Sequence, residues 1–298
     1  MLKQNLIRSR GLDRNIRRKG WLFVIPATLL ILVLCFYPMV QAFILSLQSG
    51  KGNALKWTAF SNYERILKDK TFIAAIQNTL FYLAIQVPIM LLLALILASM
   101  LNDKKLLGRG IYRTLIFLPC ATSLVSCAII FKQLFAANGF INTQLLAAGW
   151  IQEPIPFLTD AVLARLVIII TMLWRWTGYN MVFYLAGLQN IDSQVYEAAR
   201  IDGASVVQQF TGITVPLLRP IILLTTILST NGTLQLFDEV FNMTNGGPGN
   251  ATITLSVHIY RLTFQNVPQF GYASSIAYVI FLLVALLAFV QLKAGESK

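Results

Sequence analysis

The sequence predicts an all-α integral membrane protein with six transmembrane helices. The chain is 56% hydrophobic, only 12% of its residues are charged, and its mean hydropathy is +0.67. A soluble domain would carry charge on about a quarter of its residues. Backbone in lipid must satisfy its own hydrogen bonds, which favours helices of about 20 apolar residues. Such helices are expected near residues 21–47, 78–101, 114–135, 163–187, 219–240 and 271–292.

Long runs without charge account for five of these spans. They cover residues 20–50, 71–102, 114–131, 220–237 and 262–292. The remaining apolar stretch, 166–188, is interrupted only by Arg175. The uncharged run 240–260 is not counted as a span, because its segment TNGGPGNAT is rich in the residues of turns. The first run is too long for a signal peptide and no cleavage site follows it, so we expect it to remain as a span.

Positive charge is unevenly distributed between the two sides of the predicted membrane. The net charge is +12, and the side that holds both termini carries 15 Lys and Arg residues against 6 on the other side. Lys and Arg are retained in the cytoplasm, so both termini are expected there.

Residues 1–20 are predicted to form a basic cytoplasmic N-terminus, and residues 21–298 are predicted to form the six-span domain. Nucleic-acid binding is not expected, since no basic stripe lies on a soluble domain.

A charged, alanine-rich loop, residues 188–218, interrupts this apolar sequence. Its segment NIDSQVYEAARIDGAS predicts a short helix that Asp192 or Ser193 caps and that ends at Gly203. The following SVVQ fits the capping box of a second helix, which we expect Pro216 to end. A plain linker would not need two well-delimited helices, so the loop is predicted to dock on a partner protein.

Six residues of this loop resemble the EAA motif of ABC importer permeases, which reads E-A-A, three residues, G, nine residues, I-x-L-P. The matching residues are Glu197, Ala198, Ala199, Gly203, Ile213 and Pro216, and Val215 stands where Leu is usual. TNGGPGNAT resembles the T-x-G-G-P signature of sugar permeases of the maltose and glycerol-phosphate type, and YRLTFQNVPQFGYASS resembles the segment before their last span. The resemblance covers nearly the whole chain and implies a type I ABC importer permease fold in its shorter, six-span form.

The resemblance implies a transport subunit and not an enzyme. In the family the EAA segment is a coupling helix on the cytoplasmic ATPase, so the expected coupling residues are Glu197, Ala198, Ala199, Asp202 and Gly203. The chain has no G-x-x-x-x-G-K-[ST] loop to hold nucleotide phosphates, so it is expected to bind no cofactor directly. ATP-Mg would be used by the partner. The implied partners are an ATPase homodimer, a second and different permease, an extracytoplasmic solute-binding protein and the bilayer of the bacterial plasma (inner) membrane.

Two polar segments inside the predicted spans are candidates for a sugar site. In WRWTGYN, Arg175 would cost about 3 kcal/mol facing lipid and is expected to point inward, while Trp174, Trp176 and Tyr179 offer rings for stacking on a sugar. STNGTLQLFDE adds hydroxyl and amide groups. By resemblance to the maltose-type relatives, the expected substrate-binding residues are Arg175, Trp176, Tyr179, Ser229, Gly232, Thr233 and Leu236. The alternative for each is packing between helices, which also uses small and polar residues.

The sequence disfavours two other classes of function. An ion-gradient-driven secondary transporter of a small polar solute would need acidic residues at mid-membrane, where the sequence places none. A membrane enzyme would need converging catalytic or metal-binding side chains. The chain has a single histidine, His258, expected in a solvated outer loop, and three cysteines without ligand spacing. No catalytic residue and no metal ligand is therefore predicted. Asp238 and Glu239 are expected to mark the outer end of the fifth span, and the alternative for them is a gate or a contact with a docked partner.

Overall fold

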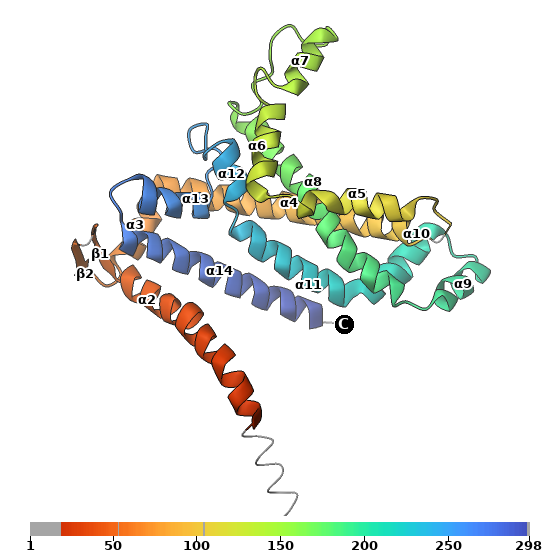
Figure 1. The fold of residues 1–298 in the computed structure, drawn as a ribbon, viewed down its shortest axis with the longest axis horizontal. Helices are drawn as coiled ribbons and strands as arrows, with labels where there is room; N and C mark the ends of the chain where they lie inside the picture. Colours follow the sequence, from red (N-terminus) through yellow and green to blue (C-terminus); the bar gives the residue numbers. More distant parts are fainter. Residues whose placement is uncertain (1–18, 53, 104, 297–298) are drawn as a thin grey trace, which may run out of the picture.

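The computed structural model describes residues 19–52, 54–103 and 105–296, so most of the predicted basic N-terminus, residues 1–20, lies outside it. The all-α class is confirmed, because long helices lying side by side make up most of the molecule (Figure 1). Within the described residues, the only sheet is an antiparallel hairpin of β1 (Gln48–Lys51) and β2 (Ala54–Trp57).

Five helices in the described part of the chain are long and apolar enough to cross a membrane. The first covers Lys19–Ser46, contains a π-helical turn at Leu32–Phe36 and ends as α2 (Tyr37–Ser46). The others are α4 (Lys70–Asn102), α8 (Ala161–Gln189), the helix Val206–Leu234 and α14 (Phe270–Glu296). Helix α4 begins ahead of the predicted span 78–101 because Asp69 caps it.

The third predicted span, 114–135, is not one continuous helix. Helices α5 (Arg109–Ala121) and α6 (Leu124–Leu134) meet at an angle of 98° and together make at most one broken span. Thr122 between them has extended backbone, which interrupts the helical hydrogen bonds. An apolar sequence of this length predicts a continuous helix by its periodicity alone, so the break was missed.

The helix that follows the polar loop also differs from the prediction. Pro216 does not end a helix, because α10 (Val206–Gln209), a π-helical turn (Phe210–Thr214) and α11 (Val215–Leu234) run on without interruption. A local π-helical adjustment is one way in which membrane helices accommodate a proline. At its other end α11 stops at Leu234, ahead of the end of the predicted span 219–240.

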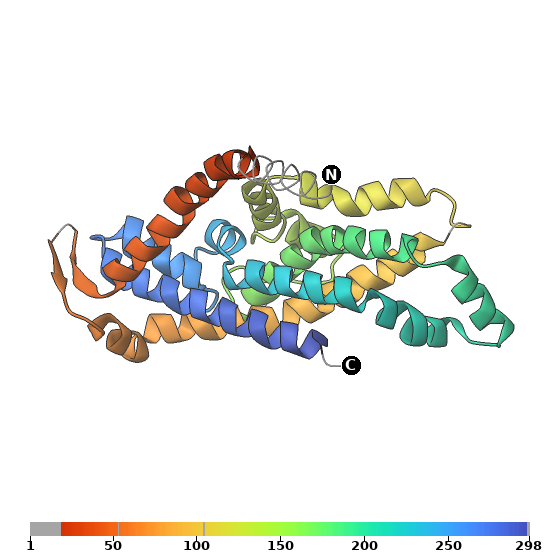
Figure 2. The same ribbon diagram turned by 90° about the horizontal axis from the view of Figure 1, so that it is seen from below.

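The two ends of the long helices carry different structures (Figure 1, Figure 2). The hairpin and α3 (Ser61–Lys68) lie at one end, and α9 (Ser193–Ile201) and α10 lie at the opposite end. Helix α7 (Phe140–Ala147) projects beyond α6. The short helices α12 (Asp238–Met243) and α13 (Leu255–Tyr260) precede a π-helical turn at 261–265 that leads toward α14.

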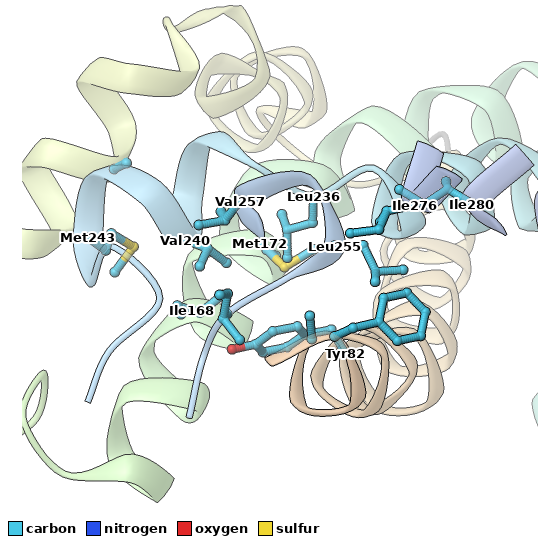
Figure 3. Close-up of a cluster of buried hydrophobic side chains, with 14 of the residues drawn as sticks. Tyr82, Ile168, Met172, Leu236, Val240, Met243, Leu255, Val257, Ile276 and Ile280 are labelled. Atoms are coloured by element: carbon cyan, nitrogen blue, oxygen red, sulfur yellow. The ribbon is translucent and has the colours of Figure 1, made fainter. Parts of the chain in front are cut away.

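Two buried apolar clusters hold the helices together. In the first, side chains converge from several helices, among them Tyr82 of α4, Met172 of α8 and Leu255 of α13 (Figure 3). The second lies nearer to α9 and joins α4, α8 and α11 through residues such as Met181 and Leu218. Close packing of this kind drives helix association in lipid. The stretches of α4, α8 and α11 between the two clusters carry polar side chains, among them Gln86, Asn180 and Ser229.

His258 is buried in α13 and is not the solvated loop histidine that the sequence predicted. Its Nε2 atom lies 3.4 Å from the Asp69 carboxylate, which also accepts a hydrogen bond of 2.6 Å from the Tyr272 hydroxyl. Burial lowers the pKa of His258 below its ordinary 6.5, and this effect outweighs the attraction of Asp69. Burial opposes ionisation of Asp69, but hydrogen bonds from Tyr272 and Thr71 and the charge of His258 hold its pKa below 3.8.

We expect acidic pH to destabilise the contact between α13, the start of α4 and α14, which His258, Asp69 and Tyr272 join. Because the unfolded chain protonates His258 more readily than the folded one, stability falls as pH drops below about 6.5. Asp69 acts in the same direction at lower pH, as the pH falls toward its own lowered pKa. The apparent melting temperature should therefore decrease between about pH 6.5 and pH 5. His258 is the sole histidine, so His258→Gln should flatten this part of the profile; an unchanged slope would contradict the assignment.

Candidate functional site

Arg175 of α8 holds the bend between α5 and α6. Its side chain is 5% exposed, and Nη1 donates to the Pro119 carbonyl and the Thr122 hydroxyl, both at 3.1 Å. Nη2 donates to the carbonyls of Cys120 (3.4 Å) and Thr122 (2.8 Å). A helix that stops inside the membrane leaves carbonyls unpaired, and the guanidinium supplies donors in a fixed fork. The inward orientation predicted for Arg175 is confirmed, but its terminal nitrogens are engaged by the broken span.

A cavity of about 310 Å³ lies between the two apolar clusters. Its wall is formed mainly by the middle of α4 and α8, the C-terminal end of α11 and the start of α12. The lining residues are Gln86, Met90, Leu124, Met172, Trp176, Tyr179, Asn180, Leu228, Ser229, Gly232, Thr233, Gln235, Leu236, Phe237, Asp238 and Glu239. Aromatic rings combined with a few hydrogen-bonding groups are typical of sites for small polar ligands.

Six of the seven predicted substrate-binding residues line this cavity. They are Trp176, Tyr179, Ser229, Gly232, Thr233 and Leu236. Arg175 is the exception, and its guanidinium lies 5.3 Å from the Trp176 ring. Trp174, which the sequence offered as a third stacking ring, is 48% exposed on the outer surface of α8 and packs on Phe131. The structure thus gathers the predicted set in one place, and a substrate role for these residues stays a prediction.

Hydrogen bonds fix the polar groups of the cavity wall. The indole N–H of Trp176 donates to Glu239 Oε1 at 3.4 Å, and its ring meets Tyr179 edge-on with centroids 5.8 Å apart. The Thr233 hydroxyl donates to the Gln86 side-chain oxygen at 3.2 Å. Asn180 donates to the Trp176 carbonyl at 3.0 Å. Side chains held in this way present their remaining polar atoms in a defined arrangement.

Sequence reasoning missed several of the lining residues. Gln86 is a polar residue in the middle of a predicted span, and Asn180 ends the quoted WRWTGYN segment, so both carried a signal that was not used. Glu239 was assigned to the end of the membrane, but it is 3% exposed and lies in the cavity wall. It reaches this position because the chain turns after Leu234 and α12 packs back against α6 and α8. In the described residues, no group of His, Cys, Asp and Glu is placed to hold a metal ion.

The EAA segment forms α9, as the sequence predicted. The Asp192 carboxylate caps it by accepting from the Gln194 N–H at 3.0 Å. It ends in a Schellman arrangement around Gly203, whose φ is +78°. The Gly203 N–H donates to the Arg200 carbonyl, and the Ala204 N–H donates to the Ala199 carbonyl. The capping box predicted for the next helix is also confirmed.

The surface around α9 is exposed and partly apolar. Glu197, Ala198 and Asp202 are exposed, Ala199 is half-buried, and Ile201 is 86% exposed. Val206 and Val207 at the start of α10 are also exposed. Exposed apolar side chains next to charges, at the end of the molecule farthest from the hairpin, are typical of a docking surface.

The segment TNGGPGNAT, residues 244–252, is tied to the helices and is not a free loop. Asn78 of α4 donates to the carbonyls of Asn250 and Ile253, each at 3.0 Å. Arg165 of α8 donates to the Ala251 carbonyl at 2.7 Å and to the Asn78 side chain at 3.0 Å. The positive charge near the start of α8 is thereby satisfied within the protein, as membrane segments require. This signature segment is therefore held against α4 and α8.

Comparison with known proteins decides the family. Residues 90–294 match the profile of the family described as binding-protein-dependent transport system inner membrane component. The chain belongs to this family. The permease is 53% identical over 97% of both chains to the lactose transport system permease protein LacF of Rhizobium radiobacter. It is also 31% identical to the trehalose/maltose transport system permease protein MalF of Thermococcus litoralis, over 94% of both chains.

Solved structures support the fold. The permease superposes with a TM-score of 0.84 on a chain of a bacterial ABC transporter involved in the import of the acidic polysaccharide alginate, covering 96% of the permease and 99% of that chain at 23% identity. The type I importer permease fold predicted from the sequence is confirmed. The permease is a multi-pass inner-membrane transport component and not an enzyme, and ATP hydrolysis belongs to a separate subunit. The secondary-transporter alternative finds no support in these relatives.

Proposed function

We propose that the permease is one of two permease subunits of an ATP-driven importer of a disaccharide related to lactose. The observation that carries this proposal is the cavity between the two apolar clusters, lined by Trp176, Tyr179 and several hydrogen-bonding side chains. The 53% identity to the lactose transport permease supports the choice of sugar. A second permease completes the pore, two ATPase subunits drive it, and a solute-binding protein delivers the sugar from outside.

The proposed orientation places α9 and both termini in the cytoplasm. The distribution of Lys and Arg supports it, with 15 on that side and 6 on the other. The Arg219 guanidinium at the start of α11 donates to the Ala294 carbonyl near the end of α14, so the C-terminal end lies on the same side as the coupling loop. The hairpin and α3 then face outward.

In this arrangement the exposed α9 surface docks on an ATPase subunit. ATP-driven closure of the two ATPase subunits moves α9 and reorients the helices around the cavity, as in other transporters that alternate between two states. Glu197 is positioned for an ion pair with the ATPase, and Gly203 gives the turn its shape.

Uptake of radiolabelled lactose into proteoliposomes that contain the whole importer tests the proposal. Trp176→Ala should lower uptake about tenfold or more, because it removes a large ring from the cavity wall. Trp174→Ala is the matched control, since this ring lies on the outer surface two residues away, and uptake should stay close to that of the parent. Lactose uptake that needs no ATP, or that is absent from the parent importer, would contradict the proposal.

A further inference from the structure

We propose that Asp238 and Glu239 make the cavity selective for neutral sugars and that Glu239 positions the Trp176 ring; this inference rests on the proposed function. The two residues line the cavity at the start of α12. They face a space whose other polar groups are side-chain amides, hydroxyls and the Trp176 indole N–H. The permease would accordingly exclude phosphosugars and sugar acids.

Charge is one-sided in this cavity. Among its lining residues, all in the described part of the chain, two are acidic and none is Lys, Arg or His. The nearby Arg175 has both terminal nitrogens engaged by the bend between α5 and α6. A phosphate or carboxylate that enters loses hydration and meets no Lys, Arg or His side chain in the cavity lining, which is unfavourable away from water. The hydroxyl groups of a neutral sugar instead donate to the carboxylate oxygens, and such hydrogen bonds are stronger than neutral ones.

Glu239 has a second effect through Trp176. A buried indole N–H normally finds an acceptor, and here that acceptor is Glu239 Oε1 at 3.4 Å. The bond joins α8 to α12 and keeps the N–H of Trp176 at the edge of the cavity. The ring also lies edge-on to Tyr179, so it is oriented from two sides. Glu239 is therefore a positioning residue for the ring as well as an acceptor for sugar hydroxyls.

Equilibrium dialysis against the purified importer, with the solute-binding protein left out, tests the inference. The probes are radiolabelled lactose and radiolabelled lactobionate, its close analogue in which one end is a carboxylate. The parent should bind lactose at least about tenfold more tightly than lactobionate at pH 7. Glu239→Gln keeps the shape of the side chain and removes its charge, and it should weaken lactose binding several-fold. In the double variant Asp238→Asn with Glu239→Gln, the ratio of lactose affinity to lactobionate affinity should shrink about tenfold.

Glu153→Gln is the matched control, because Glu153 is exposed in the outer segment before α8 and should leave both affinities unchanged. The ratio of the two affinities separates selectivity from a general loss of folded protein, which lowers the binding capacity for both sugars equally. The inference is overturned if the parent binds lactose and lactobionate equally, or if the double variant Asp238→Asn with Glu239→Gln keeps the parent's preference for lactose. Lactose uptake that persists in either case leaves the proposed function standing. Absence of lactose binding and uptake in the parent overturns the proposed function as well.

Discussion

Gly203→Val is expected to abolish ATP-driven uptake and to release the ATPase subunits from the permease. Gly203 has φ +78°, a conformation that costs an ordinary L residue roughly 1–2 kcal/mol and a β-branched residue more. A methyl group at this position would meet no atom of the permease within 4 Å, so the effect acts on the backbone turn and on the docked partner. The measurements are lactose uptake and the ATPase activity that co-purifies with the tagged permease.

Gly203→Asn is the matched control, because asparagine tolerates the left-handed conformation better than other residues with a side chain. It should retain much of the uptake that the valine variant loses. Gly203→Asp adds a charge at the same turn and should obstruct docking even where the backbone is kept. Retention of both the ATPase and full uptake by the valine variant would show that the shape of this turn is not needed for coupling.

Much of the permease fold could be predicted from the sequence, because lipid imposes a simple rule on the backbone. Apolar runs with little or no charge located the five long helices, and capping residues located both ends of α9 and the start of α10. Six predicted cavity residues also converge, although they came from two separate segments. They converge because α8 and α11 pack against each other, and each helix presents residues three or four positions apart on one face.

The parts that escaped prediction depend on contacts between distant segments. The bend between α5 and α6 exists because Arg175, more than 50 residues later in the chain, supplies donors for the interrupted helix. Glu239 belongs to the cavity only because the chain turns back after α11, and His258 is buried only because α13 packs beside α4 and α14. Periodicity and local turn chemistry contain no information about such partners.

Arg175→Met is expected to lower the stability of the permease by about 2–4 kcal/mol, which corresponds to roughly 3–6 °C in melting temperature for a chain of this length. Methionine fills much of the same volume but donates nothing, so the carbonyls of Pro119, Cys120 and Thr122 lose a donor in a region away from water. Uptake should fall as well, because Leu124 at the start of α6 lines the cavity and its position depends on the bend.

Arg113→Met is the appropriate comparison, since Arg113 lies in the same broken span but donates one side-chain hydrogen bond, to the Leu101 carbonyl at 2.7 Å, where Arg175 donates four. Its loss should lower the melting temperature by a smaller amount. Arg175→Lys should lie between the parent and the methionine variant, because one ammonium group cannot reach all the acceptors that the planar fork serves. An Arg175→Met importer that melts with the parent and transports lactose normally would show that the α5–α6 bend is set by its own residues and not by α8.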